Sequence, residues 1–261
     1  WYFAEGCTRE GFSEWLCLQN PGDGDIEVHA RYMLFGAEPR DEVYPVPARS
    51  RNSINVEGAV GQGQDVSVML WSEGEFYAER PMYFNYRQGQ PGYSWDGGHV
   101  TFGVTSPRTK WYFAEGCTRD GFEEWLCIQN PADSEAHVYI DYILAGAPTQ
   151  QKYYPVPPRS RFSVSVNSDV AAGQDVSAYV HSDVPIVCER PMYFRYGAVY
   201  HRGTWTGGHV VMGASFPGTD WYFAEGCTRE GFEEWICIQN PNPAGANLHV
   251  TYATSAGVVE R

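Results

Sequence analysis

A block of twelve residues recurs three times in this chain, at a constant interval. It reads WYFAEGCTREGF from Trp1, WYFAEGCTRDGF from Trp111 and WYFAEGCTREGF again from Trp221. When the ranges 1–110 and 111–220 are aligned without a gap, half of the positions carry an identical residue. Solenoid repeats are roughly 20–50 residues long, whereas about 100 residues suffice for a self-sufficient domain. The repeat therefore predicts tandem domains of one kind.

This repeat divides the chain into residues 1–110, residues 111–220 and residues 221–261, the last being the first part of an incomplete third unit. The joints at 106–110 and 216–220 are short and contain proline, which predicts stiff couplings. Because residue 1 lies inside the motif and is not methionine, we expect an excerpt or a processed product. Residues 221–261 hold about three expected strands, roughly half of what a sandwich needs. We therefore expect a longer chain, or a neighbouring molecule that completes the unit by strand addition.

Apolar and polar residues alternate within each unit, which is typical of half-buried strands. The apolar set of the first unit is Ile26, Val28, Ala30, Tyr32 and Leu34, and that of the second is Ala136, Val138, Ile140, Tyr142 and Leu144. In the first unit we expect strands at 1–5, 15–19, 26–34, 41–46, 51–56, 66–72, 76–86 and 99–105. Seven or eight short strands per unit, with no helix-length amphipathic stretch, predict an all-β fold of tandem immunoglobulin-like β-sandwiches.

The charge of the chain excludes two classes of partner. Its formal net charge is -14, so a phosphate backbone or an anionic membrane surface would be repelled. No apolar run approaches the length of about 20 residues that a membrane span needs. We expect neither nucleic-acid binding nor membrane insertion.

Two cysteines recur in each unit with a constant spacing. The pairs are Cys7 and Cys17, Cys117 and Cys127, and Cys227 and Cys237. Because the first cysteine ends one expected strand and the second lies in the next, we expect a hairpin closed by a disulfide, which would place the protein outside the reducing cytosol. Reduced structural thiols are the alternative, and zinc would need closer ligands. Cys188 has no counterpart, and we interpret it as an inward, inert thiol or as an intermolecular bridge.

The motif Glu-Arg-Pro recurs at Arg80 and Arg190 and interrupts an expected strand with a proline that cannot donate to a ladder. One reading makes Arg80 a ligand-binding cation. We favour the other, in which both arginines bond to a carboxylate at a junction between units, with Glu5 and Glu115 as candidate partners.

The motif Trp-x-Gly-Gly-His recurs with Trp95 and His99, and with Trp205 and His209. Such a group could stack a sugar ring or hold a metal. No second histidine or carboxylate keeps a constant distance in both units, however. We therefore predict that these four side chains pack between units and that the chain has no metal site.

Neither a cofactor nor a catalytic activity is expected. Asp23, Gly24 and Asp25 resemble a fragment of a calcium loop, but the other units do not repeat it. No nucleophile elbow, HExxH zinc motif or phosphate-binding loop occurs. The sequence therefore predicts a protein that is not an enzyme.

The motifs WYFAEG, E-W-[LI]-C-[LI]-Q-N-P, E-R-P-M-Y-F and W-x-G-G-H-V together resemble a tandem repeat of large secreted or cell-surface bacterial proteins. The resemblance covers the whole chain. It implies a β-sandwich module in a surface-exposed array, and it implies no catalytic residues.

These observations predict an extracellular structural protein, a segment of a cell-surface filament, fibre or stalk that is stabilised by disulfides within each repeat and by head-to-tail packing of the repeats. Its expected partner is the protein itself or a longer chain of the same repeats. The alternative is a carbohydrate-binding or adhesive module, because aromatic-rich sandwiches can present stacking platforms. The residues that would form this platform are Tyr93, Trp95, Tyr200 and Trp205.

Overall fold

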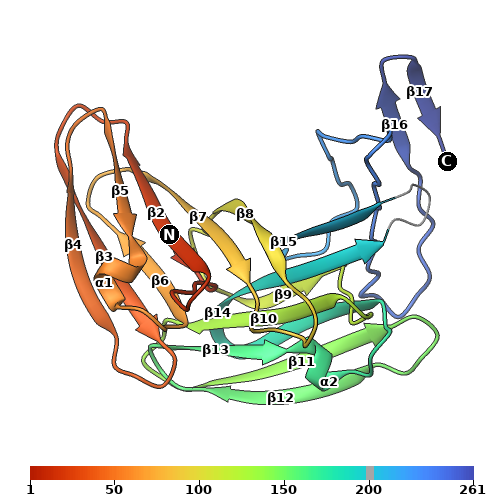
Figure 1. Cartoon of the computed structure of the whole chain (residues 1–261), viewed down its shortest axis with the longest axis horizontal. Coiled ribbons are helices and arrows are strands. Elements are labelled where there is room, and N and C mark those ends of the chain that lie inside the picture. Colours follow the sequence, from red (N-terminus) through yellow and green to blue (C-terminus); the bar gives the residue numbers. More distant parts are fainter. Residues whose placement is uncertain (198–202) are drawn as a thin grey trace.

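The computed structural model describes residues 1–197 and 203–261, and most of their regular structure is antiparallel β-strand. The expected all-β class is thereby confirmed, and the sheets are consistent with a β-sandwich. Figure 1 shows two groups of sheets packed against each other, with a final segment at the far end of the second. We name these the first sheet pair (residues 1–105), the second sheet pair (residues 106–220) and the terminal segment (residues 221–261).

The first sheet pair contains two four-stranded sheets, of order β1-β6-β3-β4 and β5-β2-β7-β8. Its elements are β1 (Tyr2–Phe3), β2 (Phe12–Asn20), β3 (Ile26–Leu34), β4 (Arg40–Val46), β5 (Ser50–Asn55), α1 (Val56–Val60), β6 (Val66–Trp71), β7 (Tyr77–Tyr86) and β8 (Trp95–Phe102). Buried apolar side chains of both sheets, such as Leu16 of β2 and Val28 of β3, form one core between them. The alternating residues of β3 therefore divide between the core and the outside, as a half-buried strand requires.

The second sheet pair is joined by one long strand. Its elements are β9 (Arg108–Phe113), β10 (Phe122–Asn130), β11 (Ala136–Leu144), β12 (Gln150–Val156), β13 (Ser160–Ser165), α2 (Val166–Asp169), β14 (Val176–Gly197) and β15 (Thr204–Met212). The first half of β14 pairs with β9 and β11, and its second half pairs with β10 and β15. The register shifts between His181 and Ile186, where the strand passes from one sheet to the other.

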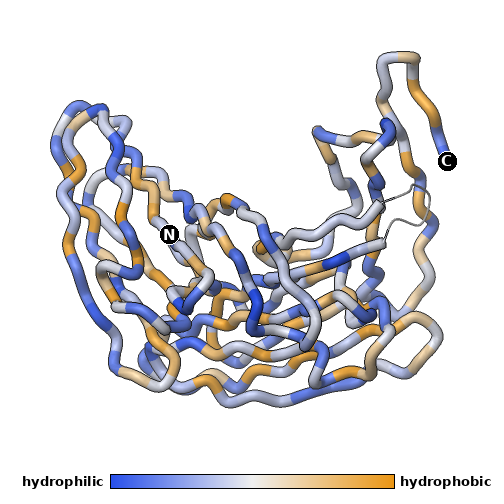
Figure 2. Tube along the Cα trace, viewed as in Figure 1, coloured by the Kyte–Doolittle hydropathy of each residue, from blue (hydrophilic) through white to orange (hydrophobic). Residues whose placement is uncertain are grey.

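Strand registers of the first sheet pair recur in the second sheet pair, at the interval of the sequence repeat. Cys17 of β2 lies opposite Ser53 and Glu79, and Cys127 of β10 lies opposite Ser163 and Glu189. Figure 2 shows hydrophobic and hydrophilic residues alternating along many of these strands. No helix in the described part of the chain is long and apolar enough to cross a membrane.

The terminal segment has little regular structure. It contains only β16 (Thr251–Thr254) and β17 (Gly257–Glu260), which pair with each other. The sequence predicts about three strands of a sandwich in this segment, and only this short hairpin forms. Many large apolar side chains are exposed, because no sheet of their own covers them; they include Trp221, Tyr222, Phe223, Phe232 and Trp235.

The expected disulfides are wrong, because all seven cysteines are free thiols. The prediction assumed that the first two strands form a hairpin, but β1 pairs with β6 in one sheet and β2 lies in the other. The backbone of Cys7 therefore forms a β-bridge with that of Asp65, whereas the side chain of Cys17 lies beside Ser53. The pairs Cys117 with Cys127 and Cys227 with Cys237 are likewise unbonded. Cys188 is fully buried and burial raises its pKa well above the ordinary value, as expected of an inert thiol.

Candidate functional site

The first sheet pair reaches into the second through the loop that follows β1. The backbone N–H of Glu5 donates to Oε2 of Glu189 at 2.6 Å, and Nη1 of Arg161 donates to the carbonyl oxygen of Gly6 at 2.8 Å. A Cβ at Gly6 would lie 2.5 Å from the carbonyl oxygen of Val66, so only glycine fits this close approach. The AEGC part of the repeated motif is thus an interface loop.

Two arginines and two glutamates form an ionic network around this loop. Nη1 of Arg80 lies 2.8 Å from Oε2 of Glu189, and both side chains are 0% exposed. The same nitrogen donates to the carbonyl oxygen of Glu5 at 2.5 Å. Arg161 lies 3.4 Å from the Glu5 carboxylate. Since the charges balance two against two, each buried ion is compensated across the interface.

A third carboxylate, Glu14, lies beside the network. Its Oε2 accepts the backbone N–H of Cys7 at 2.8 Å, while its Oε1 has no hydrogen-bond partner among the described residues. Burial raises the pKa of Glu14 to about 8, although the charge of Arg80 acts in the opposite direction. Glu124 repeats the arrangement, accepting from the N–H of Cys117 at 2.7 Å, and burial raises its pKa to about 8. A largely protonated Glu14 at neutral pH keeps the network neutral.

Cys127 belongs to the same interface. Its thiol donates to Oε2 of Glu5 at 2.6 Å and lies 3.4 Å from Nη2 of Arg161. Burial and the neighbouring Glu5 carboxylate raise the pKa of Cys127 well above its ordinary value. A neutral buried thiol of this kind is a hydrogen-bond donor and a poor nucleophile.

An aromatic cluster closes the other side of the interface. The Tyr193 ring of β14 lies edge-on to Phe84, with centroids 5.1 Å apart, and 5.0 Å from Tyr86. Tyr86 stacks on Trp95 at 5.4 Å, and the indole of Trp95 donates to the carbonyl oxygen of Gly121 at 3.3 Å. These rings bury a large apolar area where the two sheet pairs meet.

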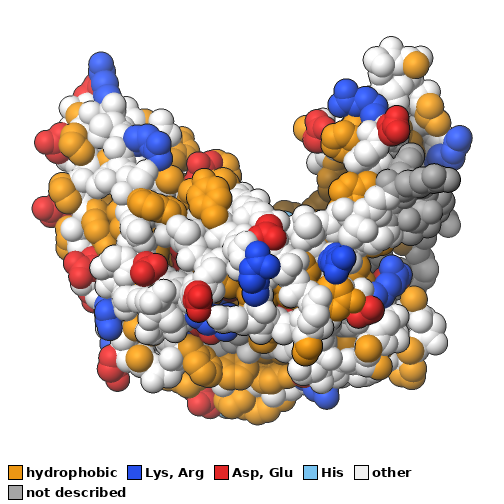
Figure 3. Space-filling model, in the orientation of Figure 1, with side chains coloured by type: hydrophobic (Ala, Val, Ile, Leu, Met, Phe, Trp, Pro, Cys, Tyr) orange, Lys and Arg blue, Asp and Glu red, His pale blue; other side chains and the backbone are white. Residues whose placement is uncertain are grey.

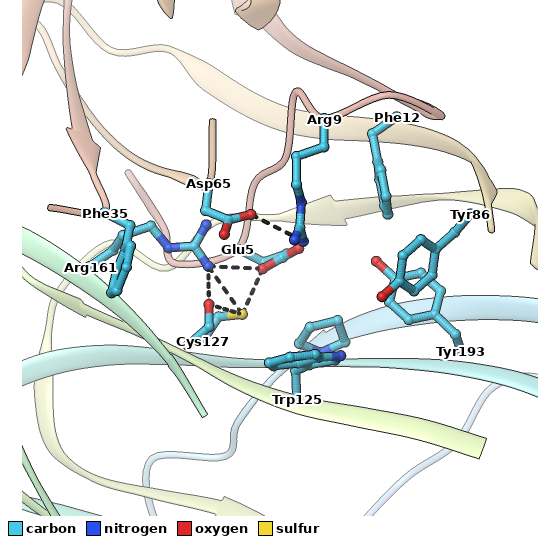
Figure 4. A pocket seen from close by; sticks show the side chains of 12 residues that line it. Glu5, Arg9, Phe12, Phe35, Asp65, Tyr86, Trp125, Cys127, Arg161 and Tyr193 are labelled. Carbon is cyan, nitrogen blue, oxygen red and sulfur yellow. Dashed lines mark hydrogen bonds and ion pairs between the residues drawn. The ribbon is translucent and has the colours of Figure 1, made fainter. Parts of the chain in front are cut away.

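A cavity of about 200 Å³ lies between the ionic network and the aromatic cluster. Figure 4 shows Glu5 and Arg161 at one end of it and Tyr86 and Tyr193 at the other. It has the volume of a few water molecules. We interpret it as a gap in a packed interface, too small for the ligand of a typical binding site.

The terminal segment repeats one contact of the first junction with the second sheet pair, and it keeps the internal hydrogen bond of the repeated turn. The hydroxyl of Tyr86 donates to Glu123 at 2.6 Å, and the hydroxyl of Tyr196 donates to Glu233 at 3.2 Å. The N–H of Cys227 donates to Oε2 of Glu234 at 2.7 Å, as Cys7 does to Glu14. The local turn therefore keeps its shape where its own sheet is absent.

The residues predicted to pack between units occupy different environments. Arg80 and Trp95 lie in the interface, although Arg80 pairs with Glu189 and touches Glu5 only at its carbonyl oxygen. Arg190 pairs with Glu115 at 3.1 Å, within the second sheet pair.

The two predicted histidines lie on strands that are in contact, β8 and β15. Burial, followed by the charge of Arg80, lowers the pKa of His99 to about 3, and burial, followed by Arg190, lowers that of His209 to about 4. His209 lies 3.1 Å from Nη2 of Arg190, a contact that requires a neutral imidazole acceptor. Both histidines are thus uncharged structural groups at neutral pH.

The aromatic residues proposed as a sugar platform do not form one continuous exposed surface. Trp95 is fully buried, Tyr93 stacks on it at 5.9 Å, and Trp205 stacks on Tyr196 at 6.1 Å. Tyr200 lies outside the described residues. In the described ranges, no three histidine, cysteine, aspartate or glutamate side chains are grouped as metal ligands would be.

Sequence reasoning missed Arg161, Glu189, Glu14 and Tyr193. Each is identical to its counterpart in the other unit, while neighbours change, as when Asn52 becomes Phe162. Charged strand residues that both units retain were therefore a usable signal. This signal could not show how one unit is oriented against the other.

No family model matches this chain, and no curated protein matches it. Among solved structures it is similar to the crystal structure of Thermotoga maritima 1070, with a TM-score of 0.37 and 18% identity, covering 43% of this chain and 98% of that chain. It is also similar to the Anabaena sensory rhodopsin transducer, with a TM-score of 0.30 and 28% identity, covering 33% of this chain and 83% of that chain. Similarities this weak carry no functional argument.

Proposed function

We propose that this chain is a non-catalytic structural repeat protein, in which immunoglobulin-like β-sandwich units, each spanning one interval of the sequence repeat, pack head to tail. The observation that carries the proposal is the fully buried Arg80–Glu189 pair, which joins the two sheet pairs. Flexibly tethered units do not need such a pair, whereas a fixed junction does, because each buried charge has its counter-charge only in one relative orientation of the units. Such an interface favours a stiff array, which suits a mechanical role.

The recurrence of contacts supports the same proposal. Tyr86 bonds to Glu123 across the first junction, and Tyr196 bonds to Glu233 at the equivalent positions of the second. A contact that repeats with the sequence interval supports a constant step between units, and a constant step generates a linear or helical assembly. We propose that the assembly is an extracellular filament, fibre or stalk on a cell surface.

The extracellular location rests on the motif resemblance alone. Free cysteines remove the argument from disulfides, and the stabilising role that we assigned to them passes to the buried network and the aromatic cluster. The glycan-binding alternative gains no support from Trp95, because its ring is buried.

Electron microscopy of the native material tests the proposal. We expect fibres with a regular axial repeat of one bead per sequence unit, labelled along their length by an antibody against this chain. Native material that contains only isolated particles without axial periodicity would contradict it.

A further inference from the structure

The first sheet pair carries an open cleft of about 870 Å³ on the sheet formed by β5, β2, β7 and β8. Cys17 and Arg51 line it together with Glu79, and the exposed rings of Tyr77 and Phe102 border it. This is a different site from the cavity between the sheet pairs. Figure 3 shows the broad hollow that separates the first sheet pair from the terminal segment, so the terminal segment leaves the first sheet pair uncovered on that side.

Cys17, Arg51 and Glu79 of this cleft each have an identical counterpart in the second unit that is already occupied. Cys127, Arg161 and Glu189 are the equivalent residues of the second unit, in the same strand registers, and they hold the Glu5 loop. Arg161 is 2% exposed and Glu189 is 0% exposed beneath that loop. Arg51 is exposed and Glu79 half-buried.

The charged residues of the cleft are unpaired, whereas the equivalent residues of the second unit are paired. Arg51 contacts only Sγ of Cys17 at 3.2 Å and Oγ of Ser53 at 2.7 Å, and neither Arg51 nor Glu79 has an ion-pair partner within the described ranges. In the occupied copy the incoming carboxylate meets the arginine and the thiol, and an incoming backbone N–H meets the glutamate. The cleft is therefore complementary to a short loop that carries one carboxylate beside a glycine.

The chain contains one such loop that is uncovered, at Glu225 and Gly226. Both residues are exposed, and the loop is held in the same turn as the Glu5 loop, since Cys227 N–H donates to Glu234 as Cys7 N–H donates to Glu14. The first sheet pair, which carries the cleft, lies at one end of the molecule, and the terminal segment, which holds this loop, lies at the other (Figure 1). Two different surfaces that fit each other give a head-to-tail contact, which extends until a rotation closes it.

We propose that the cleft of Cys17, Arg51 and Glu79 binds the Glu225 loop of a second copy of this chain. The inference rests on the proposed function and specifies its junction. The Glu225 carboxylate would contact Arg51 and the Cys17 thiol, and a backbone N–H of the loop would donate to Glu79. Charge-assisted hydrogen bonds of this kind fix the register of one copy on the next.

Sedimentation velocity of the whole chain over a range of concentrations tests this. The wild type should form a concentration-dependent series of oligomers. Arg51→Glu and Glu225→Arg should each weaken association roughly ten-fold or more, because each places like charges opposite each other. The matched controls Arg40→Glu and Glu230→Arg make the same charge changes at exposed positions outside the cleft and the loop, and they should associate like the wild type. Circular dichroism verifies that all variants are folded.

A mixture gives the sharpest result. Arg51→Glu keeps a normal loop and Glu225→Arg keeps a normal cleft, so equal amounts of the two should associate again, with normal and reversed charge pairs alternating along the series. The double variant should associate again through the reversed charges. As a second readout, alkylation of Cys17 should slow as the wild-type concentration rises.

A wild type that stays monomeric, single variants that associate like the controls, or a mixture that associates no better than either variant alone would each overturn the proposal. A monomeric wild type beside native fibres with an axial repeat would leave the proposed function standing. The cleft would then have another occupant.

Discussion

The chain presents the same three polar side chains on two faces, one closed and one open. Cys127, Arg161 and Glu189 are buried under the Glu5 loop, whereas their counterparts Cys17, Arg51 and Glu79 border an open cleft. The local sequence and the strand registers are the same. Whether these side chains are buried therefore depends on whether a loop packs on them. The three residues alone provide only the complementary charges and hydrogen-bonding groups.

The environment of the repeated tryptophan also depends on what packs against it. The indole N–H of Trp1 donates to the carbonyl oxygen of Phe76 at 3.0 Å, and that of Trp111 donates to Ile186 at 3.1 Å. Trp221 is 57% exposed, and its indole bonds only within its own turn, to Gly218. A strand that pairs with a distant partner takes its structure from that partner.

The largest expected difference between the two faces is in the effect of removing their glutamates. Glu189→Ala leaves Arg80 buried without a counter-charge, so the free energy of unfolding should fall by about 3–5 kcal/mol. Glu79→Ala removes the same side chain from the open cleft and should change it by about 0.5 kcal/mol or less. Urea unfolding of both variants measures this, and equal losses would show that the two faces are equally exposed in solution.

The buried acids predict a stability that declines as pH rises toward 8. Because the pKa of Glu14 in the folded protein is raised to about 8, the folded state binds more protons than the unfolded state between about pH 4.5 and 8. The free energy of unfolding should therefore fall as pH rises through this range, with Glu124 contributing in the same direction. Below about pH 6.5, His99 and His209 oppose the trend, because their lowered pKa values favour neutral rings in the folded state.

Thermal unfolding between pH 6.5 and 8 isolates the carboxyl effect. Glu14→Gln should remove a decline on the order of 1–2 kcal/mol, since each pKa unit corresponds to about 1.4 kcal/mol. The exposed Glu10→Gln is the control and should leave the slope as it is. An unchanged slope in Glu14→Gln would mean that this carboxyl is ionised in the folded protein.

In dilute protein, the rates of thiol alkylation should differ between the open cleft and the buried face. Cys17 is accessible from the open cleft, whereas Cys127 is 2% exposed and donates to Glu5, so we expect Cys17 to react roughly a hundred-fold faster or more. Cys227 should react first, because the neighbouring Arg229 lowers its pKa. After unfolding without reductant, mass spectrometry should find all seven cysteines alkylated. Pairs of cysteines that are not alkylated after unfolding would show that the disulfides predicted from the sequence do form.

The class of the fold could be predicted because strand alternation is a local signal. The range expected at 26–34 coincides with β3, since its apolar residues face one core. The partners of each strand are not local: β1 joins β6 and leaves β2 to the other sheet, so the spacing of Cys7 and Cys17 predicted a bridge that the topology forbids.

The buried site was even less predictable. Arg80 was recognised as a junction residue, but its partner Glu189 lies 109 residues away on the second sheet pair. Which carboxylate it meets depends on how two sheet pairs are oriented, and the position of Glu189 within its own unit gives no sign of that. Retention of the same charged residues in both units indicates that they matter without indicating what they touch.

A double-mutant cycle between Arg80 and Glu189 tests the central claim most directly, because these residues lie on opposite sides of the interface. Unfolding free energies are measured for the wild type, Arg80→Ala, Glu189→Ala and the double variant. We predict a coupling energy of about 2 kcal/mol or more, with the double variant much less destabilised than the sum of the single variants. Effects that simply add would mean that the two side chains do not meet, and that the sheet pairs are not joined through this face.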